Sequence, residues 1–209
     1  MDPRFSEVVA SEAELRALIG HPSEVVVKGR LGALDDHCRA YIAASPFVVV
    51  ASANAAGDID VSPKGDPPGF VQVLDDSMLA IPERPGNRRA DTFSNVLQNP
   101  RVALIFLVPG KQETLRVSGT ATIVRDRWLR DRMAIAGKAP ALALVVAVDE
   151  ASIHCAKCVI RSKLWDSRHW PDLEGVPSLA RAIVDQAQLA QSVAEVQAFI
   201  DADIRARLY

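Results

Sequence analysis

Short runs rich in β-branched residues recur between residues 47 and 154, and turn residues separate them. Runs at this spacing predict the strands of an antiparallel sandwich or barrel, because β-α units would place helical patterns between successive strands. The run from Thr114 to Val124 alternates its apolar residues, as a half-buried strand does. The predicted strands are Phe47–Ala53, Asp58–Ser62, Phe70–Leu74, Met78–Ile81, Val102–Val108, Thr114–Val124 and Ala141–His154.

The two ends of the chain have helical patterns instead. Ser11 with Glu14 three residues later has capping-box spacing and predicts a helix, and a second is expected over Leu34–Ala44. After Pro177 the chain contains no glycine and no further proline, which favours helix. We therefore expect a single structural domain with three parts: a helical segment (1–45) packed on the barrel, a barrel core (46–170) and a C-terminal helical extension (171–209).

Two basic segments carry the strongest functional signal, Asp60–Asp66 and Ile81–Arg89. Asn87 stands where a helix N-cap is expected, so the sequence predicts a helix over residues 88–97 with Arg88 and Arg89 in its first turn. The start of a helix carries positive partial charge, so two arginines there require an anion. That anion is either a carboxylate of the chain, from Glu83 or Asp91, or a bound phosphate.

Three motifs together resemble a known family. They are Ser62-Pro-Lys-Gly-Asp-Pro-Pro-Gly-Phe70, Ile81-Pro-Glu-Arg-Pro-Gly-Asn-Arg-Arg89 and Glu113-Thr-Leu-Arg-Val-Ser-Gly119. In order and spacing, from about Pro46 to Trp165, the chain resembles the pyridoxamine 5'-phosphate oxidase-like FMN-binding split-barrel proteins. The likeness is greatest to a bacterial subgroup with the same Ser-Pro-Lys-Gly-Asp signature.

The resemblance implies a fold, a cofactor and a set of contacts. The fold is a mainly antiparallel split β-barrel with flanking helices, forming a homodimer that binds FMN at the subunit interface. The strand Asp60–Lys64 would lie beside the flavin, Ile81 and Pro82 beneath its ring, and Asn87–Arg89 at its phosphate. The implied cofactor contacts are Asp60, Val61, Ser62, Pro63, Lys64, Ile81, Pro82, Asn87, Arg88, Arg89, Thr114, Arg161 and Trp165, the last two often supplied by the other subunit.

The implied activity is FMN-dependent oxidation or reduction of a small molecule. No catalytic side chain is assigned, because flavin N5 can accept the hydride while the protein sets the geometry. True pyridoxamine phosphate oxidases end in an Arg- and His-rich segment, whereas this sequence ends in a helical pattern through Arg205 and Arg207, so the substrate stays open. The alternatives are a non-catalytic flavin carrier or sensor, and a split barrel that uses the deazaflavin F420 or haem; a haem would need His154 or His37 as its axial ligand.

Composition excludes several other classes of protein. The net charge of -2 and the isoelectric point near 6.1 give no general field for nucleic acid or an anionic membrane. The apolar runs are too short to cross a bilayer and residues 1–7 lack the apolar core of a signal peptide, so we expect a cytoplasmic protein. Cys155 and Cys158 have zinc-like spacing but no second ligand pair, so we expect no metal site.

Overall fold

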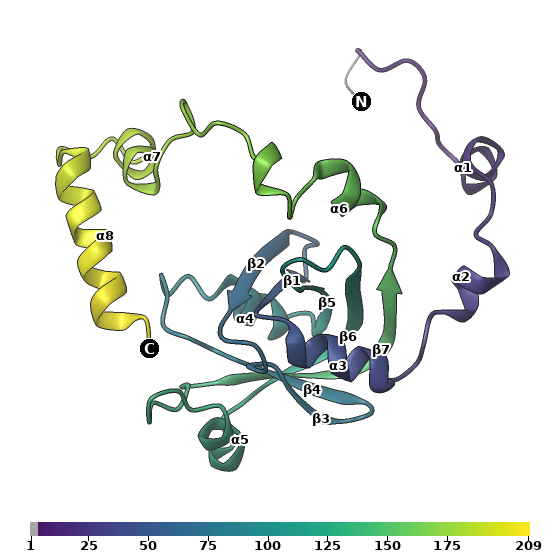
Figure 1. Ribbon diagram of the computed structural model, residues 1–209, viewed down its shortest axis with the longest axis horizontal. Helices are drawn as coiled ribbons and strands as arrows, with labels where there is room; N and C mark the ends of the chain where they lie inside the picture. The colour runs from purple at the N-terminus through teal and green to yellow at the C-terminus, as the bar shows by residue number, and fades with distance from the viewer. Residues whose placement is uncertain (1–3) are drawn as a thin grey trace.

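The computed structural model describes residues 4–209 and contains one seven-stranded sheet in which every neighbouring pair is antiparallel. The sheet curls around a core and stays open between its edge strands β2 and β3 (Figure 1), which confirms the predicted split β-barrel. In spatial order the strands are β2 (Ile59–Gly65), β1 (Phe47–Ala53), β5 (Arg101–Leu107), β6 (Thr114–Val124), β7 (Ala143–His154), β4 (Met78–Pro82) and β3 (Gln72–Asp75).

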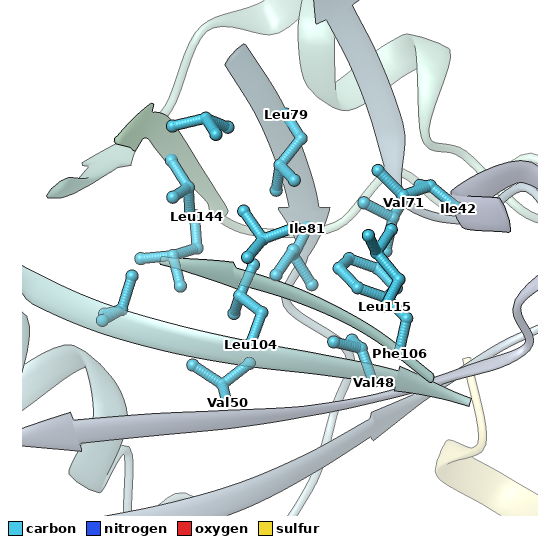
Figure 2. Close-up of a cluster of buried hydrophobic side chains, with 14 of the residues drawn as sticks. Ile42, Val48, Val50, Val71, Leu79, Ile81, Leu104, Phe106, Leu115 and Leu144 are labelled. Atoms are coloured by element: carbon cyan, nitrogen blue, oxygen red, sulfur yellow. The ribbon is translucent and has the colours of Figure 1, made fainter. Parts of the chain in front are cut away.

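The core fills the inside of the curled sheet. Side chains from five strands meet there. Ile42, from the helix that precedes β1, and Val71 lie on one side of the cluster (Figure 2). Alternation along each strand produces this core, since residues such as Val48 and Val50 point inward while Val49 points outward. The predicted hairpins and the long strand over residues 114–124 are therefore present, with end points within a few residues of those expected.

Nine helical segments flank the sheet within residues 4–209. The sequence patterns missed three of the short ones, α2, α5 and α6, because helices of five or six residues leave little periodicity to detect. The helices are α1 (Glu12–Ile19), α2 (Glu24–Lys28), α3 (Asp36–Ala44), α4 (Asp91–Val96), α5 (Arg127–Arg132), α6 (Lys157–Ser162), the 3-10 turn η1 (Ser167–His169), α7 (Leu179–Gln186) and α8 (Val193–Arg207).

The flanking helices differ in how much they bury. Helices α3 and α4 each place three side chains in the interior, so they cover the barrel. Helices α1, α2 and α8 bury no side chain, and α7 buries Ala180 alone. No helix in the described part of the chain combines the length and apolar character needed to span a membrane.

The predicted helix start at Arg88 is wrong. Helix α4 begins at Asp91, and its N-cap position is Ala90, which adopts a left-handed backbone conformation with φ of 57°. Arg88 is also left-handed, with φ of 64°, and the side chain of Asn87 accepts a hydrogen bond from the Arg89 backbone N–H at 3.0 Å. Asn87 thus caps a turn instead of a helix, and both arginines lie in the loop before α4.

A bulge between Ser118 and Gly119 lets β6 pair with β7 along their whole lengths. Gly119 lies so close to the neighbouring strand that a Cβ atom built on it would be 2.0 Å from the carbonyl oxygen of Ala147. The close approach explains why glycine occupies this position in an otherwise β-branched strand.

Candidate functional site

A cleft of about 790 Å³ opens beside the edge strand β2. Its walls come from β2, from the loop that joins β4 to α4, from residues 138–141 and from Tyr209. Nine of the residues expected to contact a cofactor line this one cleft: Asp60, Val61, Ser62, Pro63, Lys64, Pro82, Asn87, Arg88 and Arg89.

The four other residues expected to contact a cofactor lie elsewhere in this chain. Ile81 is buried in the core beneath the cleft, and Thr114 is buried at the start of β6. Arg161 is exposed on α6. The indole Nε1 of Trp165 donates a hydrogen bond to the Lys111 carbonyl at 2.7 Å, outside the cleft lining.

The alternation of β2 half-buries one set of its cleft-lining side chains. Asp60, Ser62 and Lys64 share the half-buried face of the strand, while the residues between them are exposed. The hydroxyl of Thr92 at the start of α4 donates to the Asp60 carboxylate at 3.1 Å, which ties the strand to the helix across the cleft floor. Pro63 fits here because β2 is an edge strand with β1 as its neighbour.

Lys64 is held between an anion and an aromatic ring. Its Nζ lies 3.4 Å from Oε2 of Glu83 and 5.8 Å from the centre of the Phe93 ring. The Lys64 side chain is 20% exposed, so its charge faces the cleft from a partly desolvated position. A cation in such a place attracts an anionic ligand more strongly than a fully solvated lysine does.

The loop before α4 presents two arginines in different states. Nε of Arg89 forms an ion pair with Oδ2 of Asp91 at 2.7 Å. Within residues 4–209, no carboxylate forms an ion pair with Arg88. The charge of Arg88 instead acts on Asp203 of α8: a hydrogen bond from Arg207 is the main cause of the lowered pKa of Asp203, and the positive charge of Arg88 lowers it further. Left-handed, strained residues often cluster at binding sites, and here they orient the Arg88 side chain.

Sequence reasoning included Arg84 in the second basic segment but missed Lys138 and Tyr209 as residues of the cleft. Arg84, Lys138 and Tyr209 line it, and Arg84 Nε pairs with Oδ2 of the buried Asp66 at 2.6 Å. Asp66 belongs to the Ser62–Asp66 motif, and that motif is the one signal that could have indicated a partner for Arg84. No sequence pattern connects Lys138 or Tyr209 to these residues, since they lie in segments far apart along the chain.

The cysteines and histidines do not form a site in the described part of the chain. No cluster of three potential metal ligands occurs within residues 4–209, and Cys155 and Cys158 are exposed free thiols. Burial, and then a hydrogen bond with Asp35, raises the pKa of the Cys38 thiol to about 11. Neither His37 nor His154 is among the residues that line the cleft.

One family profile matches residues 34–155, more than half of the chain, and its description is pyridoxamine 5'-phosphate oxidase. Among curated proteins, none matches the chain.

Solved structures with the same kind of fold share little sequence with this chain. A candidate pyridoxamine 5'-phosphate oxidase from Lactobacillus delbrueckii is 21% identical with a TM-score of 0.47, over 58% of this chain and 94% of that one. An F420 reductase is 20% identical with a TM-score of 0.41, over 57% and 98% of the two chains. An FMN-binding protein from Syntrophomonas wolfei is 10% identical with a TM-score of 0.42, over 55% and 79%.

Proposed function

The chain belongs to the pyridoxamine 5'-phosphate oxidase family, and on that premise we propose that it binds FMN in the cleft beside β2 and oxidises or reduces a small molecule with it. The observation that carries the proposal is the gathering of one hydroxyl and three cations, from β2 and the loop before α4, on one cleft wall. These groups are Ser62, Lys64, Arg88 and Arg89.

The donor set fits a phosphate. A phosphate monoester carries close to two negative charges and accepts several short hydrogen bonds, which guanidinium, ammonium and hydroxyl groups donate. Arg88 suits this role best, since no carboxylate within residues 4–209 forms an ion pair with it. Lys64 and Arg89 have carboxylate neighbours, Glu83 and Asp91, so a phosphate would share them with those groups.

The other residues that line the cleft fit the ring system of FMN. In our proposal, β2 borders the ring system along Asp60–Lys64, and Pro82 supports it from the core side. When bound, the flavin would supply hydride transfer at its N5 position. The chain's own contribution is to bind and orient the reactants and to exclude water from the apolar part of the cleft.

The experiment that tests this proposal compares FMN with riboflavin, which has the same ring but no phosphate. We expect calorimetric titration to give FMN an affinity at least about a hundredfold higher, because two charged hydrogen bonds of ordinary strength account for that ratio. Equal affinities would contradict a phosphate site. Turnover of the reduced flavin with an added electron acceptor would distinguish an oxidoreductase from a carrier.

A second cofactor is favoured by one specific observation. The lining of the cleft also includes Arg84 and Lys138, two further cations, and Nζ of Lys138 donates to the main-chain oxygen of Tyr209. The deazaflavin F420 has a longer acidic tail than FMN, and such a tail would extend along these two cations. The same titration with F420 decides between the two: tighter binding than FMN would assign the cleft to F420.

We also propose a homodimer with a cofactor at each subunit interface. Arg161 and Trp165 do not line the cleft of their own chain, so in the dimer they would contact the cofactor of the partner. Exposed apolar side chains support a partner surface, including Ile59 and Val61 on the free edge of β2. Light scattering during gel filtration tests the oligomeric state. A monomer at micromolar concentration with full cofactor occupancy would contradict the proposed homodimer.

A further inference from the structure

Tyr209 lines the cleft, and it follows helix α8, which buries none of its own side chains. Figure 1 shows α8, in yellow, running beside the barrel with its last residues turned toward it. Tyr209 lines the cleft together with Arg84 and Lys138.

Three contacts hold Tyr209 in the cleft wall. Its ring centre lies 5.8 Å from Cζ of Arg84, within the range of a cation–π contact. Its phenol interacts with the carboxylate of Asp66, and this interaction, followed by burial, raises the pKa of the phenol. Nζ of Lys138 donates to the backbone oxygen of Tyr209 at 2.9 Å.

The surface that receives the ring is itself fixed. The carboxylate of Asp66 is 1% exposed and pairs with Nε of Arg84 at 2.6 Å. Nη2 of Arg84 also donates to the Met133 carbonyl at 2.9 Å, which fixes the plane of the guanidinium. The ion pair does not depend on Tyr209, so it forms a docking surface that exists before the ring packs on it.

The rest of α8 has little to hold it in place. None of its side chains is buried, and its partner α7 buries Ala180 alone. A helical pair with so few buried contacts belongs to the least stable part of a fold and opens locally at low cost. The contacts of Tyr209 and the attraction between Arg88 and Asp203 are therefore what links α8 to the cleft.

We propose that α7 and α8 form a strap whose latch is Tyr209, and that the latch closes one end of the ligand cleft by packing on the Arg84–Asp66 pair. With the latch closed, the ring and the Lys138 contact narrow the end of the cleft beside Arg84. Opening the latch frees that end for a ligand to enter or leave. The inference rests on the proposed function only for the identity of the enclosed ligand.

Two variants of Tyr209 separate the contribution of its ring from that of its hydroxyl, and a variant of Leu208 serves as the control. Tyr209→Phe keeps the ring on Arg84 and removes the hydroxyl that interacts with Asp66, while Tyr209→Ala removes both. Leu208→Ala alters the adjacent residue, which is 61% exposed and does not line the cleft.

The first measurement is amide hydrogen exchange over residues 193–207 in ligand-free protein. We expect Tyr209→Ala to speed exchange there roughly tenfold, because it loses the interaction with Asp66 and the ring contact with Arg84, and we expect Tyr209→Phe to fall between it and the wild type. Leu208→Ala should match the wild type. Exchange that is the same in Tyr209→Ala and Leu208→Ala would overturn the latch.

The second measurement is the rate at which FMN leaves the loaded protein, followed by the recovery of flavin fluorescence. An opened latch predicts faster release from Tyr209→Ala than from Leu208→Ala, and equal release rates would overturn the closing role. The two readouts separate the proposals: faster exchange in a protein that binds no FMN supports the latch and contradicts the flavin site, and tight FMN binding with unchanged exchange does the reverse.

Discussion

Lys64 on β2 and Glu83 at the end of β4 face each other in the cleft, with Nζ and Oε2 3.4 Å apart. Both side chains are mostly covered, so the carboxylate competes directly with any anion that approaches the lysine. Glu83→Gln removes the competing charge and keeps the shape. We expect FMN binding to tighten about three- to tenfold, measured by quenching of flavin fluorescence, which corresponds to about 1 kcal/mol.

The matched control for this substitution is Glu12→Gln. Glu12 pairs with Arg16 at 2.7 Å on α1 and does not line the cleft, so the same change in net charge there should leave FMN affinity unaltered. Equal effects of the two substitutions would mean that Glu83 acts through the overall charge and not through Lys64.

The two arginines of the loop before α4 should contribute unequally. Arg89 is paired with Asp91, whereas no carboxylate in the described chain pairs with Arg88. We expect Arg88→Ala to weaken FMN binding by about 2 kcal/mol, Arg89→Ala by about 1 kcal/mol, and the double variant to lose the flavin while keeping its fold. Titration measures the affinities and circular dichroism the fold. Arg181→Ala, on α7, is the control, and full flavin occupancy in the double variant would refute the phosphate site.

Gly119 tests the barrel independently of any ligand. A methyl group there would lie 2.0 Å from the Ala147 carbonyl oxygen, a backbone atom that cannot move without separating β6 from β7. Gly119→Ala should therefore lower the free energy of unfolding by about 3 kcal/mol or more, measured by urea denaturation. Gly32→Ala, where nothing lies within 4 Å of the added methyl, should change it little. Equal stability of the two variants would contradict the described strand pairing.

The buried thiol of Cys38 should make the free energy of unfolding depend on pH in alkaline solution. Burial raises the pKa of its thiol from 9.0 to about 11, so below pH 9 the thiol is protonated in both folded and unfolded chains. Between pH 9 and 11 the unfolded chain ionises first, and the free energy of unfolding falls by roughly 2 to 3 kcal/mol. Urea denaturation across that range should show a shallower decline for Cys38→Ala than for the wild type. Identical slopes would mean that this thiol ionises as freely when folded.

The sequence was sufficient to predict the strands, and two of its basic segments supply the strand and the loop that line the cleft. Alternation along Thr114–Val124 and the turn residues between runs determine which faces are buried, and that information is local. Two motifs also predicted the strand and loop that form the cleft wall. The helix start at Arg88 was wrong because Asn87 caps a tight turn, and left-handed residues at 88 and 90 place the helix three residues later.

The gathering of Lys138 and Tyr209 near Arg84 could not be predicted, for a different reason. Lys138 and Tyr209 come from a loop and from the segment after α8, and each approaches Arg84 through contacts between distant parts of the chain. No periodicity or capping pattern encodes such contacts. Thr114 and Arg161 illustrate the reverse case, since the resemblance associates them with the cofactor although they lie outside the cleft of their own chain.

The most direct test of the central claim is the visible absorption spectrum of freshly purified protein, with the released chromophore identified by mass after denaturation. The account predicts flavin bands at about 370 and 450 nm and the mass of FMN. A colourless protein that also fails to bind added FMN would contradict it.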